Sequence, residues 1–203
     1  MKQFNDKVFT YLAIWLIILL NCYIYYLEFK YGRNFTISNS TALHFGASFG
    51  KLNYHGQIWR LFTAMWLHLS LMHLVSNMIA LYLFARMIVP CFYTYQILLI
   101  YFISGLVGTI VSSIYQPNII AAGASTAISG LLGAMLGFIA LPRSQYKIDG
   151  VLNYAIELLL LNTIGQMGTN TDIAGHIGGA IAGFLISLII CLFKRWHMHV
   201  YGY

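Results

Sequence analysis

Two short glycine-rich passages place a serine and a histidine inside otherwise apolar stretches of this chain. Gly-Ala-Ser-Thr at 123–126 carries Ser125, and Gly-His-Ile-Gly-Gly at 175–179 carries His176. A hydroxyl beside an imidazole forms a nucleophile with its general base. Polar groups inside a membrane cost free energy unless they have partners, so their presence there indicates a function. The pair predicts a Ser–His hydrolase that works within the bilayer.

A second pair of polar residues can supply the donors that such a reaction needs. His73 and Asn77 are four residues apart and share one face of a helix. Their N–H groups can point at one developing oxyanion, and the backbone amide of Ser125, near a helix start, is a third donor. Because Asp172 lies one turn before His176 and is expected at the aqueous rim, we predict a catalytic dyad rather than a triad.

Composition places these residues in a membrane protein. Of 203 residues, 60% are hydrophobic and 8% are charged, and the mean hydropathy is +0.74. Soluble domains carry roughly a quarter charged residues. The net charge of +6 is scattered between apolar stretches, which argues against a nucleic-acid partner and for the lipid bilayer. Three distant cysteines without a CxxC pair predict neither disulfides nor a zinc site.

Six apolar segments are long enough to cross a bilayer, which takes about 20 residues. They span residues 8–27, 67–88, 93–115, 121–141, 150–166 and 172–193, and the fifth is the shortest. The first is expected to be a retained signal anchor, since no small-residue cleavage site follows it. We therefore expect an all-α, polytopic bundle of six transmembrane helices that forms one membrane domain over 1–203.

The positive charges predict the orientation of this bundle. With both termini in the cytoplasm, seven of the eleven Lys and Arg lie inside and four lie in one long outer loop, about 28–66. The inside residues are Lys2, Lys7, Arg86, Arg143, Lys147, Lys194 and Arg195, and the outside ones are Lys30, Arg33, Lys51 and Arg60. The aromatic second half of the loop is expected to lie at the outer interface.

With this topology the candidate residues fall in the outer half of the membrane. Ser125 and His176 are each expected about four residues, or roughly 6 Å, below the outer ends of their spans. His73 and Asn77 are expected about six and ten residues down the second span.

Small residues predict how the fourth and sixth spans pack. The fourth has them at Ser129, Gly130, Gly133, Ala134 and Gly137, and the sixth has Gly175, Gly179 and Gly183. Such stripes let helix backbones approach closely, which would bring Ser125 near His176.

These motifs together resemble the rhomboid intramembrane serine proteases. The matching patterns are His68-x4-His73-x3-Asn77, Gly123-x-Ser125, His176-x2-Gly179-x3-Gly183 and, in the first loop, Trp59-Arg60. The resemblance covers about residues 55–190. Thr126 and Ser129 depart from the family pattern, which often has Gly and an aromatic at these positions.

The resemblance implies an activity and a set of roles. Ser125 is the nucleophile, His176 the general base, and His73 with Asn77 the oxyanion side chains. The supporting residues are His68, Trp59, Arg60, Gly123, Gly179 and Gly183. The substrate would be a transmembrane segment of another protein, cut near its outer end without a cofactor, in a plasma membrane that is expected to be bacterial. The oligomeric state stays open.

Two other functions stay open. The chain can be a catalytically inactive relative of these proteases that binds transmembrane helices. It can also be a small transporter that uses Glu157, an acid within the fifth span. Metal binding is not expected, because His68 and His73 diverge around their helix and no HExxH motif occurs.

Overall fold

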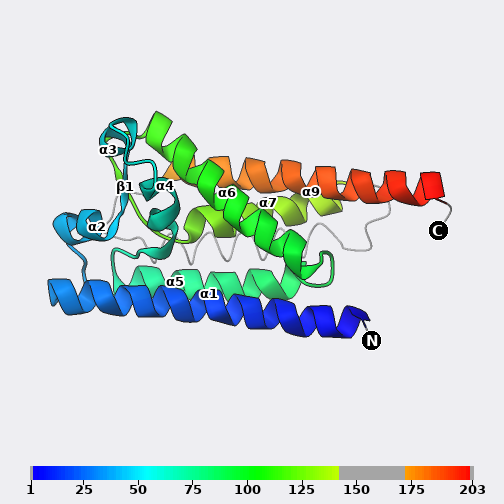
Figure 1. Cartoon of the computed structure of the whole chain (residues 1–203), viewed down its shortest axis with the longest axis horizontal. Helices are drawn as coiled ribbons and strands as arrows, with labels where there is room; N and C mark the ends of the chain where they lie inside the picture. Colours follow the sequence, from blue (N-terminus) through cyan, green and yellow to red (C-terminus); the bar gives the residue numbers. More distant parts are fainter. Residues whose placement is uncertain (1, 142–171, 202–203) are drawn as a thin grey trace.

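The computed structural model describes residues 2–141 and 172–201 of the chain. Five longer helices lie side by side, with α6 crossing the others at an angle (Figure 1). They are α1 (Lys2–Gly32), α5 (Leu71–Ile88), α6 (Thr94–Tyr115), α7 (Ser125–Ile139) and α9 (Ile173–Tyr201). Helix α7 packs against α5, α6 and α9, while α1 packs against α5 and α6. Buried Leu81, Ile97 and Leu131 lie in the core between these helices.

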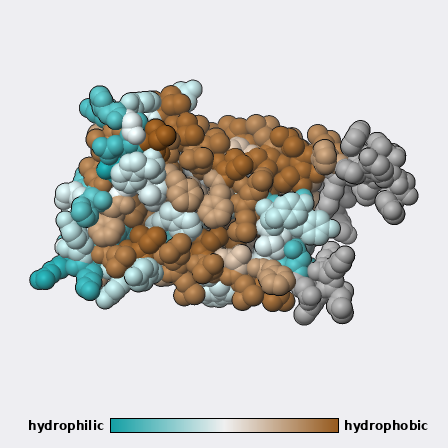
Figure 2. All heavy atoms as spheres, in the orientation of Figure 1, coloured by the Kyte–Doolittle hydropathy of each residue, from teal (hydrophilic) through white to brown (hydrophobic). Residues whose placement is uncertain are grey.

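The molecule has the surface of an integral membrane protein. By length and composition, Asp6–Gly32, Leu71–Ile88, Thr94–Tyr115 and Ile173–Phe193 can each cross a membrane. The α7 helix is apolar and has 15 residues. On the face shown in Figure 2, hydrophobic residues predominate along the middle, and many of the hydrophilic ones gather at the end that carries α2 and α3. The expected all-helical membrane fold is confirmed. The expected fifth span, 150–166 with Glu157, lies outside the described residues, so the number six stays a prediction.

The segment between α1 and α5, which is called the outer loop after its expected side, is folded into short elements that lie over one end of the bundle. It contains α2 (Asn39–Phe45), β1 (Ser48–Phe49), α3 (Gly50–Tyr54), α4 (Arg60–Thr63) and the 3-10 helix η1 (Ala64–Trp66). The only regular strands among the described residues are β1 and β2 (Ile120–Ala121), which pair antiparallel with Ser48 opposite Ala121. This pairing joins the loop to the segment that precedes Ser125.

Three expected span boundaries are wrong, each for a local reason. Helix α1 continues to Gly32, so the loop does not begin at 28. Helix α5 begins at Leu71 rather than 67, because the Ser70 hydroxyl caps it by accepting from the His73 amide. Helix α7 begins at Ser125 rather than 121, because strand β2 precedes it. Ser125 is therefore the first residue of its helix and does not lie four residues below the helix start.

Helices α7 and α9 pack through their small residues, as the sequence predicts. A Cβ atom at Gly183 would collide with the carbonyl oxygen of Gly130, and one at Gly133 with that of Ala180. One at Gly179 would meet the carbonyl of Thr126 in the same way. The two backbones thus touch at successive turns and leave no room for side chains between them.

Candidate active site

Ser125 is placed by a turn that requires glycine. Gly123 has a φ of 132°, a conformation that side chains rarely tolerate. Its amide donates to the carbonyl of Ala64 at 2.9 Å, which fixes the turn to the outer loop. The chain then enters α7, so the Ser125 amide is among the helix N–H groups without an intrahelical acceptor. Ser125 is 6% exposed and borders a small pocket.

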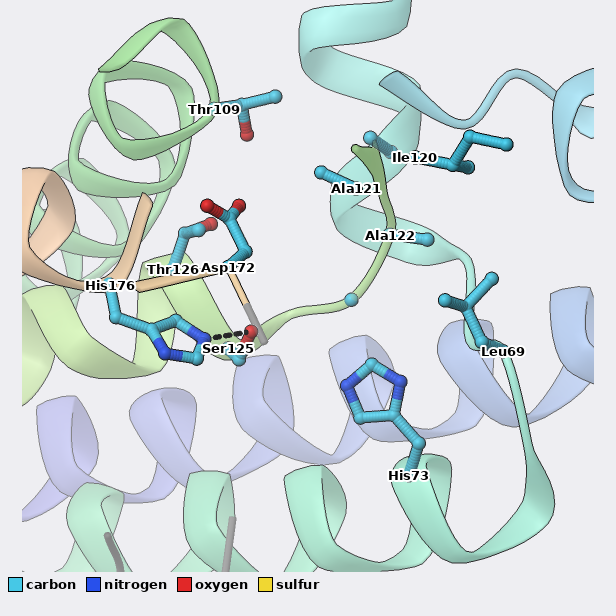
Figure 3. A pocket seen from close by; sticks show the side chains of 12 residues that line it. Leu69, His73, Thr109, Ile120, Ala121, Ala122, Ser125, Thr126, Asp172 and His176 are labelled. Atoms are coloured by element: carbon cyan, nitrogen blue, oxygen red, sulfur yellow. Dashed lines mark hydrogen bonds between the residues drawn. The ribbon is translucent and has the colours of Figure 1, made fainter. Parts of the chain in front are cut away.

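His176 contacts this serine directly. Its Nε2 lies 2.8 Å from Ser125 Oγ, in a hydrogen bond between α9 and α7 (Figure 3). The imidazole is half-buried and belongs to the first turns of α9. A neutral imidazole that accepts the hydroxyl proton at Nε2 is the arrangement for activating a serine nucleophile.

Asp172 lines the same pocket rather than only the aqueous rim. Its Oδ1 accepts from the Gly175 amide at 2.9 Å, and its backbone carbonyl accepts from the His176 amide. The carboxylate therefore caps the start of α9 (Figure 3). Within the described residues no hydrogen bond joins it to the His176 ring, so the geometry is that of a dyad supported by a helix cap.

In Figure 3 the His73 ring lies on the side of Ser125 opposite to His176. It packs on Gly123, where an added Cβ would come within 2.8 Å of its Cε1 and 2.9 Å of its Nε2. The residue is 3% exposed, and neither ring nitrogen has a hydrogen-bond partner within the described residues. The His73 ring thus borders the pocket beside Ser125 with both nitrogens buried and unpartnered among the described residues.

Asn77 lies one turn further along α5 and does not border the pocket. Its side-chain amide donates to the backbone carbonyl of His73 at 2.9 Å, and the residue is buried. The structure therefore places Asn77 on the expected helix but with its donor turned to its own backbone. This bond uses one of the two N–H donors of the amide, and the second has no hydrogen bond to a described residue.

The ring of His68 packs against the ring of His73. The two rings meet edge to face with their centroids 5.2 Å apart, and His68 is fully buried just before α5. Burial and the adjacent His73 ring hold the pKa of His68 well below its usual range, so His68 is neutral near pH 7. It takes no part in the pocket lining.

Trp59 and Arg60 anchor the outer loop. Arg60 is buried, and its Nη1 donates to the carbonyls of Leu43 and Ala47 at 2.7 and 3.1 Å. Its guanidinium also lies over the Trp59 ring, 4.5 Å from the centroid. These contacts hold the segment that leads into β1, and neither Trp59 nor Arg60 lines the pocket beside Ser125.

Thr126, which departs from the family pattern, also lines the pocket. The Thr126 hydroxyl donates to the Gly105 carbonyl of α6 at 3.4 Å, so its polar atom is directed toward that helix. The pocket is otherwise lined mainly by small and apolar residues of the loop, β2 and α6, which are Ala64, Leu69, Thr109, Ile120, Ala121 and Ala122. No group of three or more His, Cys, Asp or Glu suited to a metal ion occurs among the described residues.

Glu28, a buried acid that contacts the amide of His68, was not among the predicted site residues. Glu28 is fully buried in α1, and its Oε2 accepts from the backbone amide of His68 at 3.1 Å. The predicted outer loop begins at this residue, whereas α1 continues past it to Gly32. The residues after Glu28 include Lys30 and Gly32, so the hydropathy pattern gives no signal for this extension.

Comparison with known proteins agrees with this geometry. The family model for the Rhomboid domain matches residues 55–193. RHOMBOID-like protein 7 of Arabidopsis thaliana is 36% identical over 164 residues, which are 78% of this chain and 51% of that protein. Rhomboid protease GluP of Bacillus subtilis (strain 168) is 35% identical over 193 residues, 95% of this chain and 36% of that protein.

A more distant relative is matched along more of its length. Rhomboid-like protease 3 of Toxoplasma gondii is 24% identical over 203 residues, 96% of this chain and 76% of that protein. By contrast, the chain spans about half or less of the length of the Arabidopsis and Bacillus relatives.

Proposed function

The chain belongs to the rhomboid family, and from this premise we propose that it is an intramembrane serine endopeptidase with a Ser125–His176 dyad. The observation that carries the proposal is the 2.8 Å contact between His176 Nε2 and Ser125 Oγ within a bundle of apolar helices. Relatives named as proteases support the same activity.

The proposed reaction is acyl transfer to serine followed by hydrolysis. His176 Nε2 takes the hydroxyl proton as Ser125 Oγ attacks the scissile carbonyl carbon. The negative charge on the carbonyl oxygen is stabilised by the Ser125 amide and by a His73 ring N–H. The protonated His176 then gives its proton to the leaving amine, and water hydrolyses the acyl-enzyme by the same route in reverse.

Asn77 enters this scheme as a further donor. One N–H of its amide donates to the His73 carbonyl at 2.9 Å, and the proposal assigns the second N–H to the oxyanion. A hydrogen bond to this oxygen strengthens as its negative charge develops.

The proposed substrate is a transmembrane segment of another membrane protein. Because Ser125 begins α7 and His176 lies near the start of α9, the dyad is near one end of the apolar helices. A substrate helix with weak helix formers at that depth can present an extended peptide bond to the pocket. With both termini cytoplasmic, this end faces outward, and we propose the plasma membrane as its location.

A cleavage assay in liposomes tests the proposal. The wild type, Ser125→Ala and His176→Ala are compared on a generic single-span reporter. Each substitution should lower kcat by about 10³-fold or more, because the dyad acts as one unit. Ser129→Ala on the same helix and His55→Ala, an exposed residue, are matched controls that should keep the activity.

If the wild type does not cleave the reporter, a serine-directed fluorophosphonate probe shows whether the nucleophile is active. Labelling of the wild type that disappears in Ser125→Ala means an active nucleophile with an unsuitable reporter. If the wild type shows no cleavage and no labelling, the protease proposal is overturned in favour of an inactive member that binds transmembrane helices.

A further inference from the structure

The buried carboxyl of Glu28 is the polar group that the reaction scheme leaves unused. It lies one turn before the end of α1, within the apolar span Asp6–Gly32, and has no exposed surface. An acid at such a position is costly to bury and indicates a function. Its Oε1 has no hydrogen-bond partner within the described residues. The hydrogen bond that Oε2 accepts from His68 is therefore the contact from which we infer a role for this acid.

That hydrogen bond holds the turn from which helix α5, the helix of His73 and Asn77, begins. The His68 amide donates to Glu28 Oε2 at 3.1 Å, across 40 residues of sequence. The same turn is held on its other side by backbone pairing, in which Ile37 donates to Leu69 and Leu71 donates to Phe35. Helix α1 therefore fixes the point at which the chain enters α5.

Two successive contacts connect this turn to the segment that carries Ser125. The His68 ring packs edge to face on the His73 ring, with 5.2 Å between centroids. The His73 ring in turn packs on Gly123, two residues before Ser125. A shift of the His68 backbone would thus displace His73 relative to the carbonyl oxygen that it is to stabilise.

We propose that Glu28 is a positioning residue, which sets the place of the His73 donor through the backbone amide of His68. This inference rests on the proposed protease function. It assigns no contact with substrate to Glu28, and it explains why an acid is kept inside α1.

A pair of substitutions separates positioning from simple burial. Glu28→Gln keeps an acceptor oxygen on a side chain of the same length, whereas Glu28→Leu removes it. Asn21→Leu is the matched control, because Asn21 is also fully buried in α1 but donates to Ile17 of its own helix. We expect Glu28→Leu to lower kcat about 10-fold with KM little changed, a fraction of the loss for a whole oxyanion donor. Glu28→Gln should restore most of kcat, and Asn21→Leu should keep it.

A double-mutant cycle tests the route through His73. If Glu28 acts through this ring, Glu28→Leu should cost less than about twofold in a His73→Ala background. Equal losses in both backgrounds would overturn the proposal, because a purely structural effect adds to that of His73→Ala.

Amide hydrogen exchange provides a readout that needs no proteolysis. Exchange of the peptide containing residues 67–70 should accelerate in Glu28→Leu, and remain near the wild-type rate in Glu28→Gln and Asn21→Leu. Unchanged exchange in Glu28→Leu would overturn the anchoring claim even in an active enzyme. If the wild type cleaves nothing and Ser125 is not labelled, the protease proposal fails instead, and the positioning role fails with it whatever the exchange rates show.

Discussion

The helices that carry Ser125 and His176 meet backbone to backbone, whereas the helix that carries His73 is held through polar side chains around its first turn. In the first region, Gly130 and Gly183 touch without intervening side chains. In the second, Glu28 holds the turn before α5, and Ser70 caps the helix.

The two kinds of contact respond differently to change. A backbone contact between glycines has no rotamers to adjust, so the distance between α7 and α9 is fixed by van der Waals contact. Hydrogen bonds around α5, such as that of the Asn77 amide, can be removed one at a time by substitution. We therefore expect substitutions between α7 and α9 to act in an all-or-none way, and those around α5 to act in graded steps.

The largest effect is expected at Gly183. Gly183→Leu places a side chain against the Gly130 carbonyl, so α9 has to move away from α7 and the dyad separates. Cleavage and fluorophosphonate labelling should both fall more than about 100-fold, and the thermal midpoint should drop, since overpacking costs about 1–3 kcal/mol or more. Ile181→Phe, which adds bulk on the exposed face of the same helix, is the control. Retained labelling in Gly183→Leu would show that the dyad tolerates a wider helix separation.

Gly123 lies where the two regions meet and should lose activity without losing the fold. A Cβ there would approach His73 Cε1 to 2.8 Å, and the φ of 132° adds backbone strain. Gly123→Ala should lower kcat/KM about 100-fold, the effect of losing one oxyanion donor. The thermal midpoint should change far less than in Gly183→Leu.

A second glycine separates strain from the contact with His73. Gly56 has a φ of 92° and open space around its Cβ position, so Gly56→Ala carries backbone strain alone. If both substitutions lower kcat/KM equally, the His73 contact is not what limits Gly123, and the two regions are less closely joined than the geometry indicates.

The sequence predicted the glycine-packed region better than the polar one. Spacing of small residues is a local pattern, and it identified the α7–α9 contact and the approach of His176 to Ser125. The start of α7 was placed four residues too early, because apolar β2 is indistinguishable from helix by hydropathy.

The polar region depends on contacts between distant parts of the chain. Nothing near Glu28 in sequence indicates that its carboxyl meets the amide of His68, 40 residues away. The same applies to Asn77, which lies on the expected helix, although six residues from its start rather than ten, and whose hydrogen bond to the His73 carbonyl depends on its rotamer. Burial and side-chain direction in this region follow from tertiary packing, which a single sequence does not express.

The smallest effect is expected at Arg60, which anchors the outer loop and does not border the pocket beside Ser125. Arg60→Lys keeps the charge but loses the planar group that donates to Leu43, Ala47 and Gln57 together. Because Arg60 acts on the site through the loop, which meets it at the β1–β2 pairing and at the hydrogen bond from Gly123 to Ala64, kcat/KM should fall about fivefold, in line with the roughly 1 kcal/mol of a single net hydrogen bond. Lys51→Gln, an exposed cation of the same loop, should have no effect. A loss at Arg60 as large as that at Gly123 would mean that the loop sets the position of the catalytic groups directly, and the graded behaviour expected around α5 would not extend to the outer loop.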